Sequence, residues 1–71
     1  MKITYDSEID ALYIQFLDSK VTTEHLAEGI AVDYDPEGQL AGIEILDAVK
    51  QFGDPGTLRQ VILEDVGLVT A

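Results

Sequence analysis

An internal repeat is the feature that most limits how this chain can fold. Residues 5–18 align without a gap on residues 34–47, an offset of 29 positions. Six of the fourteen aligned positions are identical, namely Tyr5/Tyr34, Asp6/Asp35, Glu8/Glu37, Ile14/Ile43, Leu17/Leu46 and Asp18/Asp47. A repeat of this period indicates two copies of one supersecondary unit. Each copy has the pattern of a strand, an acidic turn and a second strand.

Hydrophobic alternation predicts strands on both sides of each turn. In residues 2–6 and 30–34, large apolar side chains occupy every second position, as in a strand with one buried face. Residues 12–17 and 42–46, which follow the turns, are rich in aliphatic, β-branched and aromatic residues. We expect residues 18–28 to be a polar linker that crosses between the hairpins. The sequence therefore predicts a four-stranded antiparallel sheet built from two repeated β-hairpins.

The second turn has the residues that a tight hairpin turn requires. In Asp35-Pro36-Glu37-Gly38, the proline fixes φ for the second position and the aspartate can accept a hydrogen bond from the backbone ahead of it. Gly38 can take the positive φ that closes such a turn. This segment is therefore expected to join two strands directly.

The hydrophobic period changes after the sheet. Asp47 is a candidate N-cap for a short helix that ends at Phe52, before Gly53. Asp54-Pro55 then has the order of an N-cap followed by a proline in the first helical position. An amphipathic helix is expected next, with its apolar stripe and terminating glycine at Leu58, Val61, Ile62, Val66 and Gly67. The predicted fold class is α+β, with this C-terminal helix packed on one face of the sheet.

Length and composition restrict the kind of protein. A chain of 71 residues is one domain, and the stability of a core of this size is marginal unless oligomerisation, disulfides or a bound metal adds to it. The sequence has no cysteine and one histidine. This excludes disulfides, thiolate metal sites and cysteine nucleophiles, and it argues against a zinc site built from histidines.

The charge balance restricts the partners. Fourteen acidic residues against four basic ones give a net charge of −10, and the basic residues are scattered at Lys2, Lys20, Lys50 and Arg59. Such a chain repels phosphates, so direct binding to nucleic acid or to an anionic membrane is not expected. The N-terminus lacks the apolar region of a secretory signal, and no apolar run reaches the roughly 20 residues of a membrane span. A cytoplasmic location is expected.

Four segments of the chain carry a family resemblance. They are MKITYD at residues 1–6, DALYI at 10–14, GIAVDYD at 29–35 and GIEILDA at 42–48. Their order and spacing resemble the prokaryotic "domain of unknown function 2283" (DUF2283) family over residues 1–50. Some relatives are encoded beside small toxin-like proteins, so the resemblance implies an antitoxin-type role, and it assigns no catalytic residue. Residues 51–71 lie outside the resemblance and are expected to form a helical extension of the single domain.

A calcium-like pattern overlaps the second turn. Acids at loop positions 1, 3, 5 and 12 and a glycine at position 6 approach the EF-hand pattern: Asp33, Asp35, Glu37, Gly38 and Glu44. An EF-hand loop needs a helix on each side, whereas residues 30–32 and 43–45 are β-prone. We therefore expect a hairpin turn with solvated acids and no bound metal. The alternative is a weak divalent-cation site formed by Asp33, Asp35 and Glu37.

Candidate catalytic groups are few. His25 lies between Glu24 and Glu28 and could carry protons, but no nucleophile accompanies it, so a solvated loop histidine is expected. The acids of the first turn are the other acid/base candidates: Asp6, Glu8 and Asp10. Because so small a chain has little material for a deep substrate cleft, we expect neither catalysis nor a cofactor.

Two classes of function remain. The first is a protein-interaction module, acting as a homo-oligomer, as an antitoxin-like partner of a small basic protein, or as both. The segment 11–17 is apolar on both faces, which favours a homodimer. The expected interaction surface consists of Ala11, Tyr13, Leu17 and Leu46. The second class is a small-ligand or divalent-cation protein that uses the acidic hairpin turns.

Overall fold

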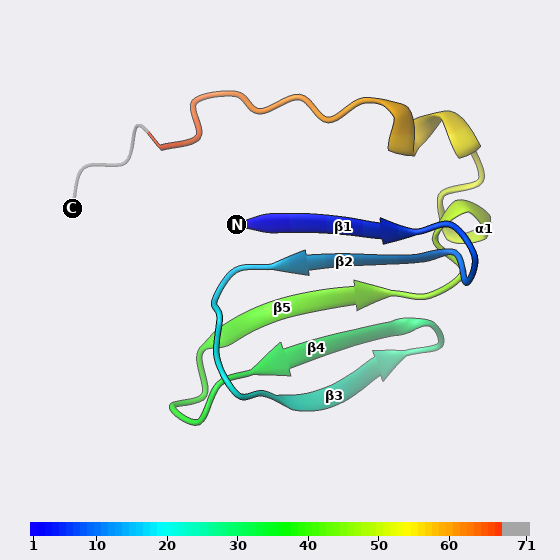
Figure 1. Cartoon of the computed structure of the whole chain (residues 1–71). Helices are drawn as coiled ribbons and strands as arrows, with labels where there is room; N and C mark the ends of the chain where they lie inside the picture. The colour runs from blue at the N-terminus through cyan, green and yellow to red at the C-terminus, as the bar shows by residue number, and fades with distance from the viewer. Residues whose placement is uncertain (68–71) are drawn as a thin grey trace.

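A five-stranded antiparallel sheet forms the body of the protein, in a computed structural model that describes residues 1–67 (Figure 1). The strands lie in the order β1-β2-β5-β4-β3, and two short helical segments follow the last strand. The elements are β1 (Lys2–Asp6), β2 (Ala11–Gln15), β3 (Thr22–Ala27), β4 (Ile30–Tyr34), β5 (Leu40–Ile45), the α-helix α1 (Ala48–Phe52) and the 3₁₀ helix η1 (Pro55–Arg59). The α+β class is confirmed.

The two repeats form equivalent hairpins. β1 pairs with β2 and β4 pairs with β5, each antiparallel and each across an acidic turn. The second strands of the two hairpins, β2 and β5, then pair with each other at the centre of the sheet. In this pairing Ile14 lies directly opposite its repeat equivalent, Ile43. The repeat therefore relates the two hairpins by an approximate two-fold rotation about that point.

The expectation of four strands is wrong, because part of the predicted linker is a fifth strand. β3, which occupies Thr22–Ala27, pairs with β4 along the far edge of the sheet. A two-residue turn, Glu28–Gly29, joins them, and Gly29 has the φ of +76° that such a turn needs. Thr22 and Thr23 are β-branched and suit a strand. The true connection, residues 16–21, passes the ends of β5 and β4 (Figure 1).

The second turn forms as the sequence predicts. The Gly38 amide donates to the Asp35 carbonyl oxygen at 3.0 Å, and Gly38 has a φ of +79°. One oxygen of the Asp35 carboxylate accepts the backbone amides of Glu37 and Gln39 at 2.9 and 2.8 Å. The hairpin interpretation of the calcium-like pattern is therefore confirmed, because both flanks are strands.

The helix that begins after Asp47 lies at one end of the sheet. Gly53 ends α1 in the left-handed conformation, and its amide donates to the Val49 carbonyl oxygen. Asp54 caps η1 by accepting the Gly56 amide at 2.8 Å. The sequence predicted the start of α1 and of η1. Asp47 itself, however, has a left-handed backbone and its side chain makes no cap hydrogen bond.

The predicted amphipathic helix over residues 58–66 is wrong. η1 ends at Arg59, Gln60 is extended, and no helix covers residues 60–67. Val61 and Ile62 are β-branched and are followed by Leu63, so the run suits an extended chain better than a helix. A short helix also needs packing to be stable, and these three side chains are exposed. No C-terminal helix therefore packs on a face of the sheet within residues 1–67.

Strand register divides the sheet into two chemically different faces. The side chains of one face, which we call the apolar face, are Ile3, Tyr5, Leu12, Ile14, Ile30, Val32, Ile43 and Ile45, with Glu24 of the edge strand β3 beside Val32. The other, which we call the polar face, carries Lys2, Thr4, Tyr13, Gln15, Thr23, His25, Asp33 and Glu44. The buried hydrophobic residues are Leu12, Ala31, Val32, Ala41 and Ala48. In residues 1–67 no helix is long and apolar enough to cross a lipid bilayer.

Candidate functional site

The apolar face of the sheet is only partly covered by the described residues. Leu12 and Val32 are buried on it, but Ile14, Ile43 and Ile45 are only half-buried, and Ile3 is 44% exposed. Among the described residues no large side chain is completely buried. A sheet with one apolar face normally buries it against a second layer, and residues 1–67 supply none. Ile14 and Ile43, which lie opposite each other at the centre of the sheet, are therefore buried only in part.

The polar face is organised around the carboxylate of Asp33. This residue lies on β4 and is 6% exposed. Its Oδ2 accepts the hydroxyl of Tyr13 from β2 at 2.9 Å, and its Oδ1 accepts the hydroxyl of Thr23 from β3 at 2.6 Å. The network crosses β5 at Gly42, where an added Cβ would collide with the Tyr13 ring. Both Asp33 oxygens are thus occupied by structural hydrogen bonds.

This environment raises the pKa of the Tyr13 hydroxyl. Burial raises the pKa of its hydroxyl above the ordinary tyrosine value, and the hydrogen bond to Asp33 and the negative charges of Asp33 and Glu44 raise it further. The neutral phenol is therefore stabilised as a donor. A tyrosine of this kind is a structural hydroxyl and a poor proton acceptor at neutral pH.

Asp10 connects the first hairpin to α1. It lies in the turn after β1 with a φ of 52°, and its carboxylate accepts the hydroxyl of Tyr5 at 2.6 Å. The same carboxylate accepts the Val49 amide at 3.1 Å, and the Asp10 carbonyl oxygen accepts the Ala48 amide at 2.9 Å. The hydrogen bond from Tyr5, followed by that from the Val49 amide, holds the pKa of Asp10 below its usual value. This carboxylate therefore anchors α1, and it is not free for acid/base catalysis.

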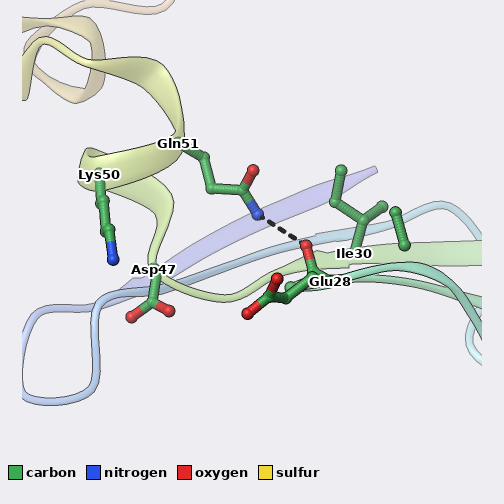
Figure 2. A pocket seen from close by; sticks show the side chains of 7 residues that line it. Glu28, Ile30, Asp47, Lys50 and Gln51 are labelled. Carbon is green, nitrogen blue, oxygen red and sulfur yellow. Dashed lines mark hydrogen bonds between the residues drawn. The ribbon is translucent and has the colours of Figure 1, made fainter.

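A shallow hollow lies between α1 and the turn that joins β3 to β4. It has a volume of about 470 Å³, and Glu28, Asp47, Lys50 and Gln51 lie around it (Figure 2). The Gln51 amide donates to the Glu28 carbonyl oxygen at 3.2 Å and so ties α1 to this turn. The hollow is open and carries both acidic and basic side chains, so its geometry selects no ligand class.

The three candidate cation ligands do not converge. Asp33 is buried on the polar face with both oxygens in use, so the expectation that it is solvated is wrong. Asp35 holds the turn through one carboxylate oxygen, and Glu37 is an exposed turn residue. Within residues 1–67 no three acidic or histidine side chains are grouped as metal ligands would be.

The four candidate interface residues do not form one patch. Ala11 and Tyr13 lie on the polar face of β2, where Tyr13 is committed to Asp33. Leu46 follows β5, which places it beside Ala11 at one end of the sheet. Leu17 lies at the other end, where its amide donates to the Ala41 carbonyl oxygen. The continuous apolar surface is instead the opposite side of the same strands.

β3 and its side chains were not predicted from the sequence. His25 is exposed on this strand and opposite Ala31, so its assignment to a loop is wrong. Thr23, a partner of the buried carboxylate, lay unnoticed in the predicted linker. The signal was present: Glu28–Gly29, directly before the apolar start of β4, has the form of a two-residue hairpin turn.

Comparisons with known proteins agree with the resemblance in the sequence. Residues 2–48 match the family model described as "Protein of unknown function (DUF2283)". The match covers all five strands and ends at the first residue of α1. Neither the curated proteins nor the solved structures gave a match. Because the matched residues are more than half of the chain, this protein belongs to the DUF2283 family.

Proposed function

We propose that this protein is an interaction module that binds another protein on its apolar face. The observation that carries the proposal is the state of the core: an apolar face of isoleucines lies open, and no large side chain within residues 1–67 is completely buried. Adding a second layer would remove this apolar surface from water, at roughly 25 cal/mol for each Å². The stabilisation that the isolated chain lacks would then come from binding.

The charge of the chain supports a basic partner. Acidic side chains occupy the turns at both ends of the sheet: Asp6, Glu8, Glu28 and Asp47 at one end, and Asp18, Asp35 and Glu37 at the other. The net charge of the chain is −10. A complementary partner has an amphipathic segment whose apolar side chains cover the isoleucines and whose lysines or arginines reach the acidic ends. A small basic protein, as in an antitoxin-type pair, fits this description.

Site-specific photo-crosslinking in host cells tests the proposal. A photoreactive side chain at position 43 lies on the apolar face, and the same side chain at position 44 lies on the polar face of the same strand. We expect a covalent adduct with one small basic protein from position 43 and none from position 44. Equal adducts from both positions, or adducts only with the protein itself, would contradict the proposal.

Binding of the purified adduct partner provides the quantitative check. Ile43→Thr makes the apolar face more polar, and Glu44→Thr is the matched control on the opposite face. We expect the first variant to weaken binding by about ten-fold or more, and the second to weaken it less. Binding should also weaken as salt rises, because screening reduces the attraction between an acidic and a basic protein.

Cation binding remains the alternative prediction, without an observation in its favour. The test is a calcium or manganese titration followed by the thermal midpoint, which a bound ion raises. Loss of that rise in Asp35→Asn and Glu37→Gln would assign it to the turn.

A further inference from the structure

Among residues 1–67, no strand pairs with the outer edge of β1. β1 pairs with β2 in an unbroken register and is exposed along its whole length, Lys2–Asp6. The other edge strand, β3, has an irregularity in its register between His25 and Ala27. Bulges of that kind discourage further pairing, and β1 has none. Its free backbone groups can therefore accept another strand.

The repeat equivalent of β1 already has a strand on its outer edge. The offset of 29 positions relates β1 to the region of β4, because Tyr5 and Asp6 correspond to Tyr34 and Asp35. The outer edge of β4 is covered by β3. The equivalent outer edge of β1 is covered by no strand of residues 1–67.

The sequence of β1 is complementary to itself in an antiparallel register. When two copies are paired about Thr4, Lys2 of one lies opposite Asp6 of the other, and Ile3 lies opposite Tyr5. Opposite charges, an aromatic side chain beside a β-branched one, and a pair of threonines are all favourable cross-strand pairs. We infer that a second copy of this chain binds along β1, so that two sheets form one continuous sheet about a two-fold axis at Thr4.

The face chemistry is consistent with this pairing. Residues opposite each other in an antiparallel pair point to the same side of a sheet. Ile3 and Tyr5 of each copy therefore extend one apolar face across both copies, and Thr4 lies on the polar side. The inference does not depend on the proposed partner, since the edge and the face are separate surfaces.

The segment after η1 is the rival occupant of this edge. Residues 60–67 run back past β1 in Figure 1. Val61 and Ile62 are 61% and 67% exposed, so they are not seated against the sheet. Using this segment as a strand would require ordering it, whereas β1 is already a regular strand. The second copy is therefore the better occupant.

Single-cysteine crosslinking tests the pairing, because the chain has no cysteine of its own. Thr4→Cys places two thiols beside the proposed axis, and Thr22→Cys is the matched control on the exposed edge strand β3. With a short bismaleimide at micromolar protein, we expect a covalent dimer from Thr4→Cys and much less from Thr22→Cys. Wild-type protein should sediment above its monomer mass of 7.8 kDa.

Charge exchange tests the register. Lys2→Asp or Asp6→Lys sets like charges against each other twice in the dimer, so each should weaken dimerisation by about ten-fold. Mixing the two variants restores opposite charges at both positions and should restore the dimer. Because the Asp6 carboxylate also accepts the Glu8 amide, the thermal midpoint of each variant is measured alongside.

Any of three results would overturn the inference. The first is equal crosslinking of Thr4→Cys and Thr22→Cys, and the second is a wild-type monomer throughout the micromolar range. The third is a crosslink within one chain in the double variant Thr4→Cys/Ile62→Cys, with no dimer, which would assign the edge to the C-terminal segment. None of these results bears on crosslinking at position 43, so failure of this inference is distinguishable from failure of the proposed function.

Discussion

The ring of Tyr13 lies directly over Gly42 and so crosses the central strand β5 to reach β4. Along this path the Tyr13 hydroxyl donates to Asp33 at 2.9 Å. Glycine at position 42 is required by space, since an added Cβ would meet the ring and, at 3.0 Å, the Ile14 carbonyl oxygen. One group of side chains, from β2, β4 and β3, thus spans four strands on the polar face.

Gly42→Ala should therefore destabilise the fold. The added methyl group displaces the Tyr13 ring, and overpacking of this kind costs about 1–3 kcal/mol. The measurement is the free energy of unfolding from urea denaturation. Gly38→Ala provides a contrast, because it has open space around it and its cost arises from its φ of +79° alone.

Removing the Tyr13 ring tests whether collision with that ring causes the loss of stability in Gly42→Ala. In a Tyr13→Val background, Gly42→Ala should cost less than in the wild type, because only the contact with the Ile14 carbonyl oxygen remains. Equal costs in the two backgrounds would show that the ring does not limit the space at position 42.

Asp33→Ala should also destabilise the fold, for a different reason. Asp33 is 6% exposed and accepts the hydroxyls of Tyr13 and Thr23, and the change leaves both without their acceptor. A loss of about 1–3 kcal/mol is expected in urea denaturation. Asp33→Asn keeps one carbonyl acceptor and an amide that can donate, so its loss should be smaller. A calcium-dependent gain in wild-type stability that disappears in Asp33→Asn would contradict this structural role.

The stability of the wild type should fall at high pH. The pKa of Tyr13 is raised in the folded protein, chiefly by burial and by the hydrogen bond to Asp33. A raised pKa means that the stabilising contribution is complete below the unfolded tyrosine value, about 10, and is lost as pH rises through the folded value. Thermal midpoints between neutral and alkaline pH should therefore fall less steeply in Tyr13→Phe. An identical slope in the two proteins would remove Tyr13 from the alkaline transition.

Local chemistry explains which parts of the fold could be predicted from the sequence. The strands β1, β2, β4 and β5 have alternation or β-branched runs, and the turn at residues 35–38 has residues with defined backbone preferences. β3 lacks a strong hydrophobic alternation because all of its residues are exposed on an edge. Its assignment depends on pairing with β4, which is a tertiary effect.

The prediction of an amphipathic helix over residues 58–66 was wrong for a related reason. A spacing of apolar residues predicts a helix only when a surface exists for the stripe to cover, and Val61, Ile62 and Val66 are exposed without one. The candidate site was likewise only partly predictable. The sequence marks Asp33 as one acid among several, and its burial follows from its strand position between Thr23 and Gly42.

The loss of folding stability at low pH should depend on Asp10. Its pKa is lowered in the folded state, first by the Tyr5 hydroxyl and then by the Val49 amide. When the folded pKa is lowered, the stabilising contribution is complete above the pKa of an unfolded aspartate, about 4, and is lost as pH falls through the folded pKa. Asp10→Asn keeps a residue that tolerates the φ of 52° but removes the charge. Its thermal midpoint should be below the wild type at neutral pH, and the difference should shrink as pH falls below about 4. Glu8→Gln, which removes a negative charge from the same turn, is measured alongside as the control for loss of charge. A constant difference between Asp10→Asn and wild type at every pH would mean that the carboxylate anchors α1 by geometry alone, without help from its charge.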